Sequence, residues 1–233
     1  MHHSTSPARQ SDSPRPEDPI VLAVTGASGT VYAVRLAQAV LQAGRHVHLV
    51  VSEAARQVAR RELGSDFPDD SASVPDWLRF LQTAFDHSPA SDWKLSEQTL
   101  PPDAELSVHS LRDYSAGIAS GSYLTGGMVI CPCSMGTLSS IACGASTNLI
   151  QRAADVHLKE RRPLVLVPRE TPLGLIALEN MVRLTQAGAT LLPAMPGFYQ
   201  TPTCVGDLVD FVVARICDHL SLPHQLTARW GDD

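Results

Sequence analysis

The chain alternates short apolar runs with longer amphipathic segments. The run at 128–131 is apolar at every position, which is typical of a parallel strand buried on both faces. We expect Pro132 to end this strand, because proline cannot donate a hydrogen bond to a sheet ladder. Short strands are predicted at residues 20–25, 46–51, 106–109, 128–131, 164–167 and 189–192, although not all of these segments are apolar throughout.

Segments with helical periodicity lie between most of these runs. The segment 31–44 carries an apolar stripe and ends at Gly44, as a helix with a glycine C′ residue would. Asn148 is a good N-cap for a later helix. Further helices are predicted at 53–63, 172–187 and 207–220. Alternating strands and helices predict an α/β protein with a doubly wound parallel sheet in three layers.

The predicted organisation is one domain at 20–220 between two tails. The segment 1–19 is polar and rich in Pro and Ser, so we expect a disordered tail, and it lacks the apolar core of a secretory signal. Residues 221–233 form a C-terminal tail. The segment 64–104 interrupts the alternation of predicted strands and helices and is rich in Asp, Ser and Pro. We interpret it as an insertion with a short helix near 76–85 that packs on the domain or on a neighbouring subunit; a loose surface loop is the alternative.

Composition narrows the class of protein. The 233 residues are 44% hydrophobic and 18% charged, enough for a proper core, and the net charge of −6 disfavours nucleic-acid binding. No apolar run reaches the roughly 18 residues of a membrane span, so no membrane partner is expected. The five cysteines form no C-x-x-C pair, which disfavours zinc and any other metal site and suits reduced thiols in the cytoplasm. They are Cys131, Cys133, Cys143, Cys204 and Cys217.

Small and hydroxylic residues gather where the predicted strands end. In an open parallel sheet, ligands bind outside the carboxyl ends of the strands, where backbone N–H groups can hold a phosphate. The turn TGASG is not the G-x-G-x-x-G fingerprint, and Ser52 stands where an acid would bind a ribose, so NAD is disfavoured. The strand-end set is Gly26–Ser28, Ser52, 134–137, Glu170 and Tyr199.

Two helices add charge to this picture. Arg152, Asp155 and Lys159 share one face of the helix that begins near Asn148, which suits a site for a phosphorylated ligand. The alternative is a solvated face, with Lys159 compensating the helix dipole. Arg215 lies beside the apolar stripe of the last helix, where an arginine stem often lies on apolar surface with its head in water.

Taken together, the motifs resemble those of the flavin prenyltransferases, the UbiX-type family. They are TGASG (25–29), LVVSEAAR (49–56), CSMGTL (133–138), NLIQRAADVHLKERR (148–162), LVPRETPL (166–173), LENM (178–181) and PGFY (196–199). The resemblance implies a flavodoxin-like or Rossmann-like fold in a homo-oligomer, commonly a dodecamer. It implies that reduced FMN is alkylated at N5 and C6 by dimethylallyl phosphate without a metal. The product would be the cofactor of a UbiD-type decarboxylase.

The resemblance also implies roles for individual residues. Glu170, Ser28 and Lys159 would be catalytic, with Glu170 as the acid that handles protons. The positions that match FMN contacts are Gly26, Ala27, Ser28, Ser52, Ser134, Met135, Gly136, Thr137 and Arg152. Those that match the prenyl-phosphate site are Lys159, Tyr199, Arg215 and, from the tail, Trp230. The segment 64–104 departs from the family by its length.

Three alternatives belong to other classes. An FMN-dependent cysteine-type decarboxylase of the same fold needs a P-x-M-N segment and a histidine after the first helix. Here PRETPLG occupies 168–174, and no histidine lies between Gly29 and His46. A non-catalytic FMN carrier would bind flavin without turnover. A short-chain reductase would need a Y-x-x-x-K pair, which is absent.

Overall fold

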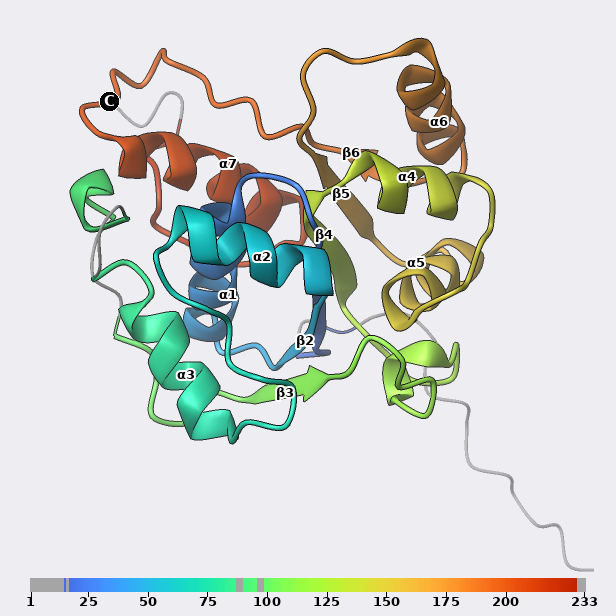
Figure 1. The fold of residues 1–233 in the computed structure, drawn as a ribbon, viewed down its shortest axis with the longest axis horizontal. Helices are drawn as coiled ribbons and strands as arrows, with labels where there is room; N and C mark the ends of the chain where they lie inside the picture. Colours follow the sequence, from blue (N-terminus) through green and yellow to red (C-terminus); the bar gives the residue numbers. More distant parts are fainter. Residues whose placement is uncertain (1–14, 16, 87–89, 96–98, 230–233) are drawn as a thin grey trace, which may run out of the picture.

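The computed structural model describes residues 15, 17–86, 90–95 and 99–229. Most of the predicted tail at 1–19, part of the segment 64–104 and the end of the C-terminal tail, including Trp230, lie outside these residues. Within the described chain, six parallel strands form one sheet in the order β3-β2-β1-β4-β5-β6 (Figure 1). The strands are β1 (Ile20–Val24), β2 (Val47–Val51), β3 (Leu106–His109), β4 (Gly127–Cys133), β5 (Leu164–Pro168) and β6 (Thr190–Leu191).

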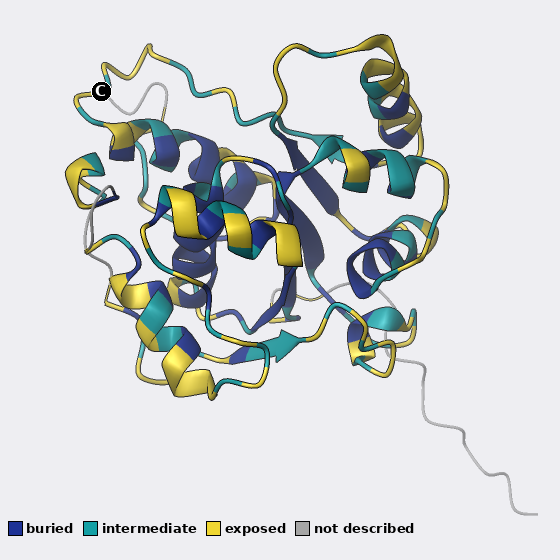
Figure 2. Ribbon diagram, viewed as in Figure 1, coloured by how far each residue is buried: buried dark blue, intermediate teal, exposed yellow. Residues whose placement is uncertain are grey.

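Helices cover the two faces of this sheet. The layer that contributes to the larger apolar core consists of α1 (Thr30–Gln42), α2 (Glu53–Glu62), α3 (Val74–Thr83) and α7 (Val205–His219). The opposite layer consists of α4 (Met135–Ala142), α5 (Leu149–Lys159) and α6 (Leu175–Gln186). Figure 2 shows the buried strands between these layers, with the outer helix faces exposed. The predicted doubly wound, three-layer fold is confirmed, because strand order reverses between β1 and β4.

The prediction that Pro132 ends a strand is wrong. β4 continues through Pro132 to Cys133, with a register shift against β5 between Ile130 and Cys133. Proline lacks an N–H group, but its carbonyl oxygen still accepts hydrogen bonds here. The register shift falls where Pro132 has no N–H to donate, and pairing with β5 resumes at Cys133.

The segment 64–104 contains the helix that the aromatic spacing predicts. This helix, α3, begins after Ser73, whose side chain accepts a hydrogen bond from Asp76 N. Trp77 is buried, donates its indole N–H to Asp69 O at 3.1 Å and packs near the rings of Phe67 and Phe80. The short 3₁₀ helices η1 (Ala90–Trp93) and η2 (Gly117–Ala119) complete the described elements. None of the helices described is long and apolar enough to cross a membrane.

Two histidines on the neighbouring strands β2 and β3 are in contact. His48 is buried; its Nδ1 lies 2.8 Å from Nε2 of His109, and its Nε2 lies 2.7 Å from the Tyr123 hydroxyl. Burial, followed by the nearby His46 and His109, lowers the pKa of His48 to about 3. Burial also lowers the pKa of His157, to about 4. Both imidazoles are therefore neutral in the folded protein at physiological pH.

These pKa values predict a loss of stability in mild acid. The folded pKa of His48, about 3, lies below the ordinary value of 6.5, so protonation favours the unfolded chain. The free energy of unfolding should be largest above pH 6.5. Protonation of His48 in the unfolded chain should then lower the free energy of unfolding by about 2 kcal/mol by pH 5. Urea titrations across this range should show a shallower pH dependence for His48→Gln.

The control is His219→Gln, because His219 lies exposed in the last turn of α7. This variant should keep the pH dependence of the wild type. An unchanged pH dependence in His48→Gln would contradict the assignment of the acid sensitivity to His48.

Candidate functional site

The carboxyl ends of β1 and β4 are joined by one buried hydroxyl group. Thr25 Oγ1 donates to Pro132 O and accepts from Ser134 N, both at 2.8 Å, and Thr25 N donates to the same carbonyl at 3.2 Å. Thr25 is the only polar residue in the apolar run 20–25. These bonds hold the turn that follows β1 beside the turn that follows β4.

The first of these turns, residues 26–29, packs closely on α2. A Cβ atom on Gly26 would collide with the Cβ of Ala54, so only glycine allows this approach. Gly29 has φ +116°, a left-handed conformation that again favours glycine. Ala27 is buried, whereas Ser28 at the tip is exposed. The turn therefore exposes Ser28 at the carboxyl edge of the sheet.

Two helices begin at the same edge with serine caps. Ser52 caps α2 by accepting from Ala55 N at 3.2 Å, and Ser134 caps α4 by accepting from Thr137 N at 3.3 Å. Helix N-termini carry partial positive charge and attract anions. Met135 is partly buried, and Gly136 faces open space, with nothing within 4 Å of where its Cβ would lie. The N-terminus of α4 is therefore open to solvent at Gly136.

Glu170 stands beside these turns at the carboxyl end of β5. Its carboxylate is exposed and accepts from Thr171 N at 3.1 Å. The preceding Arg169 donates from Nε to Ser28 O at 3.3 Å, which ties the end of β5 to the first turn. The structure thus brings the predicted positions 26–28, Ser52, 134–137 and Glu170 to one edge of the sheet.

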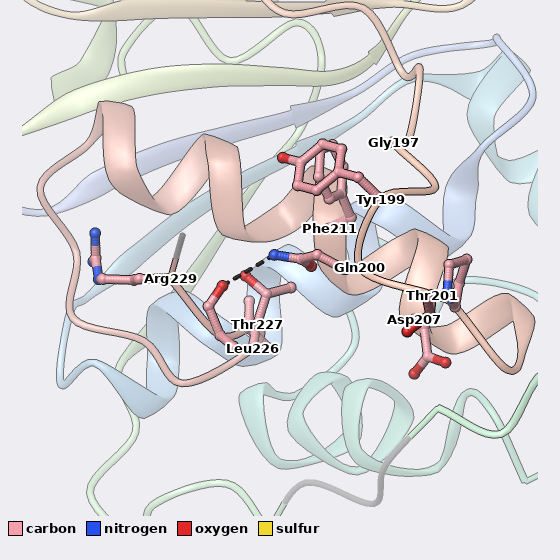
Figure 3. A pocket seen from close by; sticks show the side chains of 11 residues that line it. Gly197, Tyr199, Gln200, Thr201, Asp207, Phe211, Leu226, Thr227 and Arg229 are labelled. Atoms are coloured by element: carbon pink, nitrogen blue, oxygen red, sulfur yellow. Dashed lines mark hydrogen bonds between the residues drawn. The ribbon is translucent and has the colours of Figure 1, made fainter. Parts of the chain in front are cut away.

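Tyr199 and Arg215 line one cavity of about 330 Å³. Tyr199 contacts the Phe211 ring edge to face at a centroid distance of 5.5 Å. Arg215 is exposed on α7 and pairs with Asp218 at 2.9 Å. An adjoining cavity of about 530 Å³ is closed by the C-terminal segment, where Gln200 Nε2 donates to Ala228 O at 3.0 Å (Figure 3).

Asp218 also pairs with His224 and Arg229, at 3.1 and 3.3 Å. Burial alone would raise the pKa of Asp218, but the hydrogen bond from His224 and the nearby positive charges lower it. The carboxylate therefore stays ionised and orients the guanidinium of Arg215 beside the cavity.

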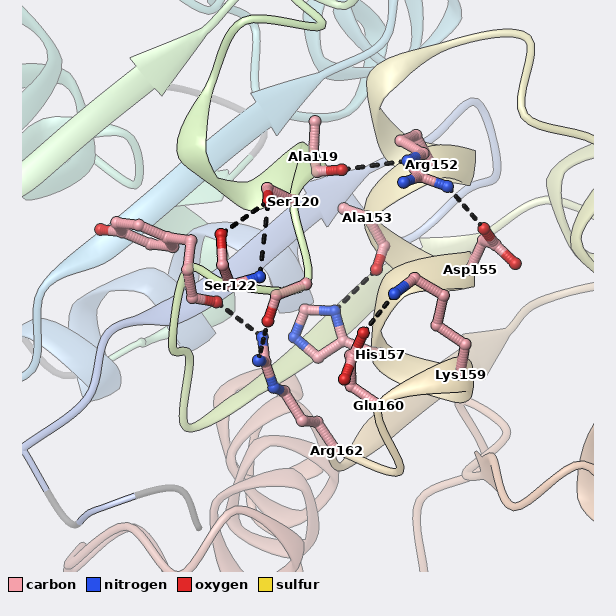
Figure 4. Close-up of polar contacts among 12 residues, drawn as sticks. Ala119, Ser120, Ser122, Arg152, Ala153, Asp155, His157, Lys159, Glu160 and Arg162 are labelled. Carbon is pink, nitrogen blue, oxygen red and sulfur yellow. Dashed lines mark hydrogen bonds and ion pairs between the residues drawn. The ribbon is translucent and has the colours of Figure 1, made fainter. Parts of the chain in front are cut away.

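Arg152 and Lys159 lie elsewhere, on α5 (Figure 4). Arg152 donates from Nε to Ala119 O at 3.0 Å and pairs with Asp155 at 2.9 Å, whereas Lys159 pairs with Glu160. Lys159 ends α5, just before β5 begins, so it stands at the amino end of the strand whose carboxyl end precedes Glu170. A five-residue strand separates the two ends by about 16 Å. A single chain therefore brings Tyr199 and Arg215 together, but not Lys159.

The sequence interpretation missed two residues at this edge, Thr25 and Arg169. Thr25 was counted only as the end of a strand, although its isolated hydroxyl in an apolar run was a usable signal. Arg169 carries no comparable signal, because its contact with Ser28 joins positions far apart in the chain. Among the described residues, no group of three or more His, Cys, Asp or Glu side chains could hold a metal ion.

Comparison with known proteins gives consistent matches over most of the chain. A family model described as Flavoprotein matches residues 8–217. The flavin prenyltransferase UbiX of Halalkalibacterium halodurans is 50% identical over 210 residues, 90% of this chain and 92% of the relative. The structure of AnUbiX in complex with FMN and dimethylallyl pyrophosphate has a TM-score of 0.74 and 35% identity, covering 92% of this chain and 98% of that one. The structure of a dodecameric FMN-dependent UbiX-like decarboxylase from Escherichia coli O157:H7 has a TM-score of 0.71 and 37% sequence identity. The match covers 91% of this chain and 98% of that one.

A parallel sheet with small residues and helix N-termini along its carboxyl edge is typical of nucleotide-binding α/β proteins. The matches make the class more specific. The chain belongs to the Flavoprotein family and, within it, to the UbiX-type flavin prenyltransferases. The resemblance carried by the sequence motifs is thereby confirmed.

The Thr25 hydroxyl predicts a measurable contribution to stability. Thr25→Val keeps the shape of the side chain but leaves the part-buried Ser134 N–H without this acceptor. The free energy of unfolding should fall by about 1 kcal/mol, the net contribution of a typical hydrogen bond. Thr25→Ser is the matched control, because it keeps the hydroxyl. Urea denaturation in which Thr25→Val equals the wild type would contradict this role.

Proposed function

We propose that this protein is a flavin prenyltransferase. It joins the dimethylallyl group of dimethylallyl phosphate to reduced FMN, first at N5 and then at C6, which adds a fourth ring. The prenylated FMN then serves a UbiD-type decarboxylase as its cofactor. The observation that carries the proposal is the 50% identity to a flavin prenyltransferase over 90% of the chain, together with the small-residue turns and helix N-termini that follow β1, β2 and β4.

The residues at this edge fit FMN. A flavin phosphate needs hydroxyl and backbone N–H donors, which Ser52 and the first turn of α2 supply. A flat ring needs small neighbours, which Gly26–Ser28 and Ser134–Thr137 supply along the edge of the sheet. Arg152, on α5 of a neighbouring copy, adds a cation for the phosphate. These residues bind and orient the flavin, and the flavin itself is the nucleophile of the reaction.

Glu170 is the proton-handling group in this proposal. It is exposed at the strand end and lies next to the Arg169 side chain that touches the first turn. A carboxylate there can exchange a proton with the departing phosphate and with the flavin ring as it closes. The Ser28 hydroxyl, at the tip of that turn, lies on the same side.

The allylic phosphate is held by Tyr199, Arg215 and Lys159. A guanidinium can grip a phosphate with two hydrogen bonds, and an ammonium adds a point charge. Trp230 belongs to the same substrate set but lies outside the described residues. Together the cations stabilise the charge that develops as the phosphate leaves.

This site requires more than one copy of the chain. Lys159 lies at the amino end of β5 in the layer opposite α7, far from Glu170 and Arg215 of its own chain. The exposed apolar face of α6 supports an interface between copies, because Leu175, Ile176 and Val182 are 70%, 75% and 56% exposed. We propose a dodecamer in which α5 of one copy completes the site of another. Five free cysteines support a cytoplasmic location.

One experiment tests the function against its alternatives. The protein is incubated anaerobically with reduced FMN and dimethylallyl phosphate, and the flavin is analysed by mass spectrometry. A flavin that gains one prenyl unit supports the proposal. Bound but unchanged FMN would indicate a carrier. A parallel incubation with a peptidyl-cysteine substrate covers the other alternative, because release of carbon dioxide there, without flavin prenylation in the first incubation, would indicate a cysteine-type decarboxylase.

Removing the acid should slow turnover without releasing the flavin. Glu170→Gln keeps the shape of the side chain but removes the exchangeable carboxyl proton, so prenylation should fall by about 10²-fold or more. FMN affinity should stay within a few-fold of the wild type. The control is Glu105→Gln, a carboxylate that is 74% exposed at the amino end of β3. Unchanged turnover in Glu170→Gln would remove Glu170 from the mechanism.

Mixed oligomers test the shared site. Lys159→Ala and Glu170→Gln subunits are inactive alone in this proposal. If the two residues of a site come from different copies, random mixing should restore both residues to about a quarter of the sites. Turnover after unfolding and refolding the two variants together measures this recovery.

The matched control mixes Lys159→Ala with Arg152→Ala. Both residues lie on α5, so every α5 in this mixture lacks one of them. No site can then receive an intact α5, and no activity should return. Equal recovery in the two mixtures, or none in either, would contradict a site shared in this way.

A further inference from the structure

One carboxylate near the end of α7 joins Arg215 to the C-terminal segment, residues 221–229. Oδ2 of Asp218 accepts from Nη1 of Arg215 at 2.9 Å. The other oxygen, Oδ1, lies 3.1 Å from Nε2 of His224 and 3.3 Å from Nη2 of Arg229. The two oxygens of this side chain therefore contact different parts of the chain, one the helix and the other the C-terminal segment.

His224 is held in place by its neighbours in this segment. Leu222, two residues before it, is buried, and Leu226, two residues after it, packs on the larger core. The His224 side chain is only 5% exposed. Because a carboxylate only accepts hydrogen bonds, Nε2 of His224 carries the hydrogen in its contact with Asp218. The position of the imidazole is therefore fixed by packing, and its direction by this hydrogen bond.

The other ring nitrogen of His224 has no such contact. Nδ1 is buried and has no hydrogen-bond partner among the described residues. A buried polar atom without a partner costs free energy, which an apolar side chain between Leu222 and Leu226 would avoid. The hydrogen bond to Asp218 is thus the contact that distinguishes a histidine from an apolar residue at this position.

The same cluster leaves positive charge beside the cavity. The cations Arg215 and Arg229 share one carboxylate, so the three side chains together carry a net charge of +1. Arg215 reaches Asp218 through Nη1, and the rest of its planar guanidinium can still bind a phosphate. Asp218 can therefore fix the direction of the guanidinium without cancelling the charge of the cluster.

We propose that Asp218 and His224 are positioning residues for Arg215. His224 fixes the carboxylate through Oδ1, and the carboxylate aims the guanidinium into the cavity of about 330 Å³ that all three residues line. The C-terminal segment thereby strengthens phosphate binding through a residue that acts on Arg215 and not on the ligand. The identity of the ligand, an allylic phosphate, rests on the proposed function.

Titration of dimethylallyl phosphate into the FMN-loaded protein tests both residues. Asp218→Asn keeps the shape of the side chain but removes its charge, and His224→Leu removes the donor. Each should weaken binding of dimethylallyl phosphate by about 10-fold, the lower end of the effect of a charged hydrogen bond. FMN affinity should not change, because neither residue lies on the turns that follow β1 and β4. His224→Gln, whose amide N–H can replace Nε2–H, should recover most of the affinity.

A double-mutant cycle separates positioning from general damage to the site. Arg215→Ala leaves no guanidinium to aim, so adding Asp218→Asn to it should cause no further loss of affinity. Additive losses would overturn the inference. So would an Asp218→Asn variant that binds as tightly as the wild type or more tightly, the result expected if Asp218 only masks Arg215. The control is His219→Leu, at an exposed position in the last turn of α7, which should bind like the wild type.

Inorganic phosphate tests the same relation without the organic substrate. Its dissociation constant, measured by isothermal titration calorimetry, should rise from the wild type to Asp218→Asn and to His224→Leu. Equal constants in the three proteins would overturn the inference. A wild type that binds inorganic phosphate but neither binds dimethylallyl phosphate nor prenylates FMN would overturn the proposed function instead, and the phosphate series would still decide the role of Asp218 and His224.

Discussion

The closure of β1 onto β4 at their carboxyl ends is the interaction on which the site depends. The sheet reverses its strand order at this pair, so α1 and α4 leave toward opposite faces and leave an open edge between them. Parallel strands offer only backbone groups at such an edge, and these must find partners once buried. The Thr25 hydroxyl satisfies two of them, on Pro132 and Ser134, and so fixes the spacing of the two ligand-facing turns.

Much of the fold could be predicted because its signals are local. The short strand segments predicted from the sequence agree with β1, β2, β3 and β5 to within one residue at each end. Side chains such as Ser52 and Asn148 cap the helices that they precede. The error at Pro132 has a physical reason. The rule against proline in a central strand concerns its missing N–H, whereas this strand uses the proline carbonyl and a register shift.

The site was less predictable, because its contacts join residues distant in sequence. Helical spacing placed Arg152 and Lys159 on one face of α5, but spacing cannot tell which layer of the sheet a helix joins. In the tertiary structure, α5 and α7 lie on different sides of the sheet, so this face of α5 is separated from Arg215 on α7. The hydrogen bond that Gly29 N donates to the Glu62 carboxylate likewise depends on how α2 folds back over the first turn, and an isolated glutamate at a helix end carries no sign of it.

The exposure of the proposed catalytic edge has a chemical consequence. Cleavage of an allylic phosphate develops positive charge on carbon, which water would capture unless the site is dry. In one chain, Ser28 and Glu170 face solvent, and Phe198 and Tyr199 are 69% and 59% exposed. In the proposed function, one chain thus places Glu170 and the two turns at this edge, but it brings neither a cover nor its own Lys159 to them. Association of copies would supply both at once, so the site would become dry and electrostatically complete in the same step.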